Sequence, residues 1–239
     1  MDDKLLTSIL QEYKILAEYN PLYCMYVHIF SKMIELEKIN GVYVIPSNKN
    51  SLLWYGVIFL RQGYYADAVF RFTISLPDKF PDEKDLPTII FQNYIFHPLI
   101  CPLRGTLNIS NVFSNWRSGE DHVWQILKYI QTIFMDTTEW IQSDYVVNNQ
   151  DAKYLAAHNQ VEFIARVRDC VAISKERIFD SPTTEDSHYI CFEKFDSKVH
   201  GTILKRIMLG NVLTDIFSHV TRSGLSLVNE DEMTPLSMK

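Results

Sequence analysis

Residues 42–46, VYVIP, are the first of four short runs that are rich in β-branched and aromatic side chains. The other three are LLWYGVIFL at 52–60, AVFRFTISL at 68–76 and TIIF at 88–91. Gly, Pro, Asn and Asp residues separate the runs, which is the pattern of strands joined by short turns. This stretch predicts a four-stranded antiparallel meander.

Helical spacing of apolar residues predicts helices on both sides of the meander. Before it, apolar residues fall on one face of a helix over 5–17. After it, residues 123–134 show the same spacing, and Ser118 and Asp121 precede them in the pattern of a capping box. A second helical pattern runs from about 151 to 178 and is expected to pack against the sheet or the preceding helix. The predicted fold class is α+β, with an N-terminal helix and C-terminal helices.

The composition changes after Asp180, where the turn-rich and acidic segment SPTTEDS occupies residues 181–187. We interpret 32–180 as the core domain, with 1–19 as its N-terminal helix, and 181–239 as a C-terminal extension. Apolar residues in the extension predict an amphipathic helix over 202–219. That helix could lie in a partner's groove, but folding back onto the core is favoured because it needs no second protein.

Charge and composition exclude several functional classes. The 239 residues carry a net charge of −6, whereas a nucleic-acid surface normally requires a basic stripe. No apolar run approaches the roughly 20 residues that span a bilayer. The four cysteines are scattered and form no Cys/His cluster, and no Gly-rich phosphate loop is present, so neither zinc nor another cofactor is expected. Free cysteines and the absence of a signal peptide predict a cytoplasmic protein.

The stretch HPLICPLRGTLN at 97–108 raises the question of catalysis. Together with the meander before it and Trp116 after it, this order resembles the ubiquitin-conjugating (UBC) fold. In that family a His-Pro-Asn motif is followed by Gly-x-Ile/Leu-Cys, whose cysteine carries ubiquitin as a thioester. At the matching positions this chain has Leu99 in place of the motif asparagine and Asn108 in place of the cysteine.

These two replacements predict that the chain is not an enzyme. The carboxamide of Asn108 is neither a nucleophile nor a leaving group at neutral pH, so it cannot form a thioester. Leu99 offers no hydrogen bond to an oxyanion, a contribution typically worth about 3 kcal/mol. Cys101 is the nearest other thiol, but it precedes Pro102 and lies ahead of the glycine turn that presents the nucleophile. We therefore expect no catalytic residue and treat Asn108 and Leu99 as degenerate active-site positions.

Further motifs narrow the resemblance. Residues 11–19 (QEYKILAEY), 41–47 (GVYVIPS) and 224–226 (GLS), with the His-Pro-Leu triplet, look like the AKT-interacting protein, or Fused Toes, subfamily of UBC variants. The likeness is strongest to its crossbronx and crossbronx-like members and covers nearly the whole chain, apart from residues 20–31, which look inserted. The resemblance implies a cytoplasmic adaptor without the active-site cysteine, with a Hook-type coiled-coil protein of a vesicle-trafficking complex as the partner.

Three hypotheses about the function of this chain follow. The first is a catalytically inactive UBC-like adaptor. The second is a variant that binds ubiquitin noncovalently and assists an active conjugating enzyme. The third is residual transfer activity through Cys101.

Overall fold

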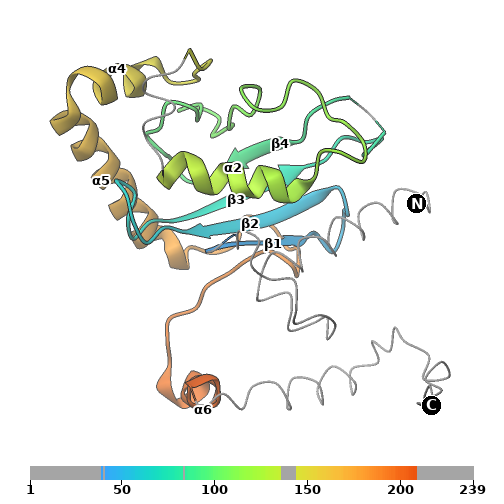
Figure 1. Ribbon diagram of the computed structural model, residues 1–239. Helices are drawn as coiled ribbons and strands as arrows, with labels where there is room; N and C mark the ends of the chain where they lie inside the picture. Colours follow the sequence, from blue (N-terminus) through green and yellow to red (C-terminus); the bar gives the residue numbers. More distant parts are fainter. Residues whose placement is uncertain (1–38, 40, 83, 136–143, 209–239) are drawn as a thin grey trace, which may run out of the picture. The chain divides into compact units, whose positions relative to one another are not determined.

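The computed structural model describes residues 39, 41–82, 84–135 and 144–208 (Figure 1). The predicted helix at 5–17 and the apparent insertion at 20–31 lie outside the described residues. The fold is α+β, as predicted. No described helix has the length and apolar character that a membrane crossing requires.

The sheet has four antiparallel strands in the order β1-β2-β3-β4, which confirms the predicted meander. The strands are β1 (Val42–Pro46), β2 (Leu53–Phe59), β3 (Val69–Ser75) and β4 (Thr88–Phe91). The register places Val44 opposite Gly56, and Gly56 opposite Phe72. Successive side chains of a strand point to opposite faces, so the sheet has an inner face that is buried in the core and an outer face.

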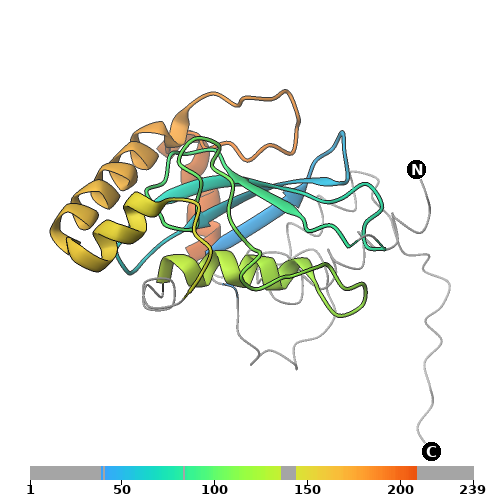
Figure 2. The ribbon, with the colours of Figure 1, turned by 90° about the horizontal axis from the view of Figure 1, so that it is seen from above.

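Helix α2 (Val123–Met135) covers the inner face of the sheet (Figure 2). The ring of Phe134 lies 5.5 Å from that of Phe70 and 5.7 Å from that of Phe91, measured between ring centroids. Gly56 is required in this layer, because a Cβ there would lie 2.3 Å from the ring of Phe72. Aromatic rings packed at these separations contribute beyond the area that they bury.

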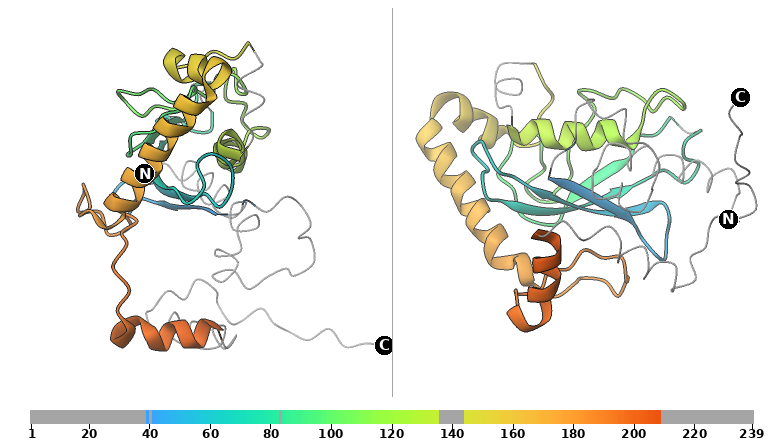
Figure 3. Two further views of the ribbon diagram at one scale, coloured as in Figure 1. Left: turned by 90° about the vertical axis from the view of Figure 1, so that its left-hand side faces the viewer. Right: turned by 60° about the horizontal axis from the view of Figure 1, so that its bottom comes forward.

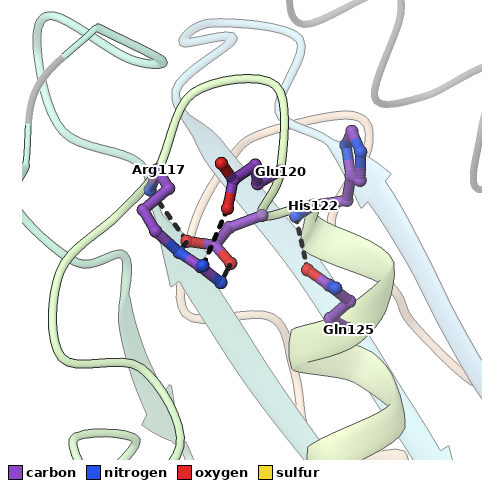
Figure 4. A network of polar contacts seen from close by, with 5 residues as sticks. Arg117, Glu120, His122 and Gln125 are labelled. Carbon is purple, nitrogen blue, oxygen red and sulfur yellow. Dashed lines mark hydrogen bonds and ion pairs between the residues drawn. The ribbon is translucent and has the colours of Figure 1, made fainter.

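The start of α2 differs from the predicted capping box. The backbone N–H of His122 donates to Oε1 of Gln125 at 2.7 Å, so Gln125 caps the helix (Figure 4). The buried Asp121 accepts hydrogen bonds from the backbone and the guanidinium of Arg117, and the same guanidinium pairs with Glu120. The predicted pairing of Ser118 with Asp121 is wrong because Arg117 is the better partner for a buried carboxylate, as a charge-assisted and bidentate donor.

The helical pattern at 151–178 forms two α-helices instead of one. Helix α4 (Gln150–His158) and helix α5 (Gln160–Glu176) meet at Asn159, and a short 3-10 helix, η2 (Arg177–Phe179), follows. Asn159 ends α4, and its side chain accepts the backbone N–H of Glu162 at the start of α5. The spacing of apolar residues did not predict this break, because asparagine can interrupt a helix by hydrogen-bonding to the nearby backbone. As predicted, the later helix packs on the sheet: Ser174 Oγ of α5 accepts the backbone N–H of Val69 at 3.3 Å.

The compact unit that holds the sheet extends through Phe192, whereas the sequence interpretation placed the start of the extension at residue 181. Residues 181–192 leave η2 and run along the side of the sheet that faces away from α2 (Figures 1 and 3).

A second unit begins at Glu193 and contains helix α6 (Ser197–Met208). The amphipathic helix predicted from 202 therefore begins five residues earlier, where Oδ1 of Asp196 accepts the backbone N–H of Lys198 at 2.8 Å. Its predicted continuation over 209–219 lies outside the described residues.

Candidate functional site

The loop after β4 holds the stretch that matches the family's transfer motif. Residues Ile100 and Leu107 pair as an antiparallel bridge, and Thr106 pairs with Ile90 of β4. Gly105 makes this pairing feasible: its φ is +68°, and a Cβ at this position would lie 2.2 Å from the carbonyl oxygen of Phe91. Only glycine satisfies both conditions, so the turn that leads to Asn108 depends on this residue.

His97 is a fully buried structural residue with a defined tautomer. Its Nδ1 accepts the backbone N–H of Leu99 at 3.0 Å, and its Nε2 lies 3.0 Å from the carbonyl oxygen of Ile133. Since an N–H donates to Nδ1 and a carbonyl can only accept from Nε2, the proton lies on Nε2. Burial lowers the pKa of His97 from 6.5 to about 4, an effect that the hydrogen bond to Ile133 only partly offsets. His97 is thus neutral at physiological pH and shapes the loop.

Leu99 lies in the core, not at the surface of the loop. Its side chain is completely buried, and its backbone carbonyl accepts the backbone N–H of Asn108 at 2.8 Å. The structure therefore brings together the two positions that the sequence analysis singled out. A buried isobutyl group has no donor for a developing oxyanion.

Both the amide nitrogen and the amide oxygen of the Asn108 side chain make hydrogen bonds. Its Nδ2 donates to the carbonyl oxygen of Val146 at 3.0 Å, and its Oδ1 accepts from the backbone N–H and the hydroxyl of Ser110 at 2.9 and 2.7 Å. The phenol of Tyr129 on α2 also donates to the backbone carbonyl of Asn108 at 3.1 Å. The side chain of Asn108 thus connects the loop to Val146 and to Ser110.

A segment from a distant part of the chain completes this connection. Residues 144–149, which we call the arm, cross beside the loop. Asn111 Nδ2 donates to Val146 O at 3.0 Å, and Val146 N donates to Asn111 Oδ1 at 2.9 Å, so one amide pairs with both backbone groups of Val146. Asn148 Nδ2 donates to Thr106 O at 3.1 Å, and Asn148 N donates to Pro98 O at 2.9 Å. The arm is therefore fastened on both sides of Asn108.

Cys101 occupies the start of the turn that ends at Gly105. Its backbone N–H donates to Thr106 O at 2.9 Å, and its carbonyl accepts from Gly105 N at 2.8 Å. Hydrogen bonds from the backbone N–H groups of Arg104 and Leu103 lower the pKa of its thiol. A lowered pKa favours thiolate, but the thiol sits before the glycine turn, as the sequence indicates.

Within the described residues, no group of three or more His, Cys, Asp or Glu side chains is placed to hold a metal ion. What this site offers chemically is a set of neutral amides, a neutral imidazole and one separate thiol. The amides of Asn108, Asn111 and Asn148 are all engaged in hydrogen bonds to neighbouring backbone groups.

Comparison with known proteins places the chain in a family. Residues 30–171 match the family model described as ubiquitin-conjugating enzyme. A crystal structure from Plasmodium yoelii assigned as a ubiquitin conjugating enzyme has the same fold, with a TM-score of 0.54 and 17% identity over 73% of this chain and 97% of that one. The chain belongs to the ubiquitin-conjugating enzyme family.

The particular relatives are crossbronx proteins. Protein crossbronx of Drosophila ananassae is 51% identical over 244 residues, which cover 100% of this chain and 96% of the relative. The crossbronx homolog of Culex quinquefasciatus is 43% identical over 235 residues, which cover 98% and 96%. These values confirm the resemblance to the crossbronx group and make this chain a crossbronx-like variant of the family.

The sequence analysis missed the arm and the two asparagines that hold it. Asn111 and Asn148 are separated by 37 positions, and nothing in the local pattern joins them. The available signal was a pair of asparagines beside the motif, at 108 and 111, and a second pair at 148 and 149. Side-chain amides are suited to pairing with irregular backbone because each carries both a donor and an acceptor.

Proposed function

We propose that this chain is a catalytically inactive UBC-like protein that acts as a protein-interaction adaptor in the cytoplasm. The observation that carries the proposal is that the amide of Asn108, the residue that the sequence matches to the family's cysteine, is hydrogen-bonded to Val146 and Ser110. A thioester needs a thiolate that is free to attack and to leave. A carboxamide that connects two segments supplies neither property.

The intact fold supports a binding role. In the described residues, the four-stranded sheet is formed and α2 packs on it through the aromatic core around Phe134. One fold can host several functions, so a UBC fold can serve recognition through its surface without ubiquitin transfer. The resemblance to the Fused Toes subfamily suggests a Hook-type coiled-coil protein as the partner, and this partner is part of the proposal.

A copurification experiment tests the adaptor role. The tagged full-length protein is purified from its native cells, and the proteins that accompany it are measured by quantitative mass spectrometry. A Hook-type coiled-coil protein at near-stoichiometric level is the expected result. Recovery of an active conjugating enzyme at that level, with no coiled-coil protein, would require the Hook assignment to be withdrawn.

Retention of the UBC fold also supports a second candidate, noncovalent binding of ubiquitin in support of an active conjugating enzyme. Titration of the labelled protein with ubiquitin, followed by NMR, tests this function. Shifts confined to one surface would favour it, and a spectrum that does not change would exclude it.

A further inference from the structure

Residues 184–192, which we call the strap, lie on the outer face of the sheet and belong to the same compact unit (Figure 3). The strap has no helix or strand of its own. It contacts the sheet and the turn after β1 through the carbonyl of Ile190 and four side chains, those of Asp186, His188, Tyr189 and Phe192; Nδ1 of His188 lies 2.8 Å from the carbonyl oxygen of Pro46. Each point recognises a different chemical group.

The first point is a carboxylate site at the turn between β1 and β2. Oδ2 of Asp186 accepts the hydroxyl of Ser47 at 2.5 Å, and Oδ1 accepts the backbone N–H of Asn48 at 3.2 Å. The backbone N–H of Lys49 also approaches Oδ2, at 3.4 Å. Converging N–H and O–H donors at a turn form a site for an anion.

The second point is aromatic. The ring of Tyr189 meets that of Tyr55 on β2 edge to face, with 5.2 Å between centroids. Its hydroxyl donates to Oε1 of Gln92 at 2.6 Å. The ring of Tyr189 is therefore packed against an aromatic residue while its hydroxyl is hydrogen-bonded.

The third point is built around Arg71 of β3, which is buried. Its Nε donates to the carbonyl oxygen of Ile190 at 3.0 Å, and its guanidinium carbon lies 5.1 Å from the centroid of the Phe192 ring. Phe192 also meets Phe59 edge to face at 5.8 Å. The cation therefore binds a backbone carbonyl and an aromatic face of the strap.

We propose that the outer face of β1, β2 and β3 is a recognition surface for a segment of a partner protein, with the strap as an internal occupant that this segment replaces. The partner segment would carry a carboxylate followed by aromatic side chains three and six positions later, as in Asp186, Tyr189 and Phe192. The strap turns between the first two of these side chains, where the backbone N–H of Tyr189 donates to the carbonyl oxygen of Asp186 at 3.0 Å, so the partner segment would adopt the same turn. This proposal rests on the adaptor role proposed above and specifies the chemistry of the partner's segment. The surface that binds the segment does not include Asn108.

The strap fits the role of a replaceable occupant. It is held to the sheet at separate points, so a competing segment can replace the contacts one at a time. A partner binds only the fraction of molecules in which the strap is open, and its apparent dissociation constant rises as that fraction falls. Weakening the strap's own anchor should therefore strengthen binding of a segment supplied from outside.

The test uses the full-length chain and a fluorescent peptide of residues 183–194 (TTEDSHYICFEK) as the probe, under reducing conditions. Binding by fluorescence anisotropy is compared for the wild type, Asp186→Ala and Glu185→Ala. The last is the matched control, because Glu185 is an exposed acidic neighbour of the anchor. Circular dichroism establishes that each variant is folded, and Tyr189→Ala replaces Asp186→Ala if that variant does not fold.

The expected result is that Asp186→Ala binds the peptide at least about ten-fold more tightly than the wild type and Glu185→Ala. A peptide in which both aromatic residues are replaced by alanine should bind at least about ten-fold more weakly than the parent peptide. Equal binding by the wild type and Asp186→Ala would overturn the proposal, as would the absence of saturable binding at millimolar peptide. Either negative result would leave the copurification test of the adaptor role unaffected.

Discussion

The side chain of Asn108 donates a hydrogen bond to the backbone carbonyl of Val146 at 3.0 Å and so joins two positions that lie 38 residues apart in the chain. Asn111 pairs with the same residue through both atoms of its amide. The position that the sequence analysis matched to the family's cysteine thus helps to hold the arm against the loop. A cysteine at position 108 could not donate to Val146 in the same way, because its thiol is a weak donor.

Restoring the thiol alone should not restore ubiquitin transfer. In Asn108→Cys, Leu99 remains buried and supplies no oxyanion donor, so lysine discharge should stay at least about a hundred-fold below that of an ordinary conjugating enzyme. The measurement is a single-turnover assay with activating enzyme, ubiquitin, ATP and free lysine, with Asn108→Ala as the control. Discharge at an ordinary rate would show that the degenerate positions do not prevent catalysis.

Cys101 should not carry ubiquitin. Although backbone hydrogen bonds lower the pKa of its thiol, it precedes the glycine turn that presents the nucleophile in the family. A non-reducing gel after incubation with activating enzyme, ubiquitin and ATP should show no thioester on the wild type. The control is Cys191→Ser, which removes an exposed cysteine. A band that disappears in Cys101→Ser but persists in Cys191→Ser would support ubiquitin transfer through Cys101 as the function.

The two asparagines that hold Val146 should be energetically coupled. Asn108→Ala and Asn111→Ala should each lower the free energy of unfolding by about 1 kcal/mol, because each removes partly exposed hydrogen bonds. The double variant should lose less than the sum, by about 0.5 kcal/mol, because removal of either amide already loosens the arm and weakens the hydrogen bond that the other amide makes to Val146. Urea denaturation measures these values, with the exposed Asn115→Ala as the control. Strict additivity would mean that the arm is not held as a unit.

His97 should make the stability depend on pH in a defined window. Its pKa is lowered to about 4 in the folded protein, so between pH 6.5 and 4 the unfolded chain binds a proton that the folded chain does not. Stability should therefore fall as the pH drops through this window, by up to about 3 kcal/mol.

The pH dependence can be assigned by substitution. In His97→Gln the part of the slope that belongs to this window should disappear, whereas His158→Gln keeps His97 and should keep the slope. Urea midpoints measured from pH 7 to pH 4 test both variants. An unchanged slope in His97→Gln would show that another group controls the acid sensitivity.

Two glycines with similar backbone angles should differ in their tolerance of alanine. Gly105 and Gly119 have φ values of +68° and +81°, but only at Gly105 does a Cβ meet another atom, the carbonyl oxygen of Phe91 at 2.2 Å. Gly119→Ala should cost about 1–2 kcal/mol for the left-handed backbone alone. Gly105→Ala should cost at least about 2 kcal/mol more, because the loop must move away from β4. Thermal or urea unfolding measures the difference, and equal costs would contradict the close approach.

The sequence predicted the elements whose signal is local. The strands β1 and β4 begin and end at the predicted residues, since runs of β-branched and aromatic side chains bounded by turn residues define them. The break at Asn159 was missed because apolar spacing continues across it while the asparagine caps the second helix. The cap of α2 was assigned to the wrong pair because the pattern at Ser118 and Asp121 does not reveal that Arg117 would bind Asp121.

The sequence by itself determined the four-stranded meander, the helices that follow it and the absence of a thiol at position 108, because these depend on residue type and short-range periodicity. The tertiary structure alone decided that Asn108 fastens the arm at Val146 and that the strap binds the outer face through Asp186 and Arg71. These contacts join segments that lie far apart along the chain. Their hydrogen bonds depend on distances and directions that arise only when the core has packed, and no local pattern encodes them.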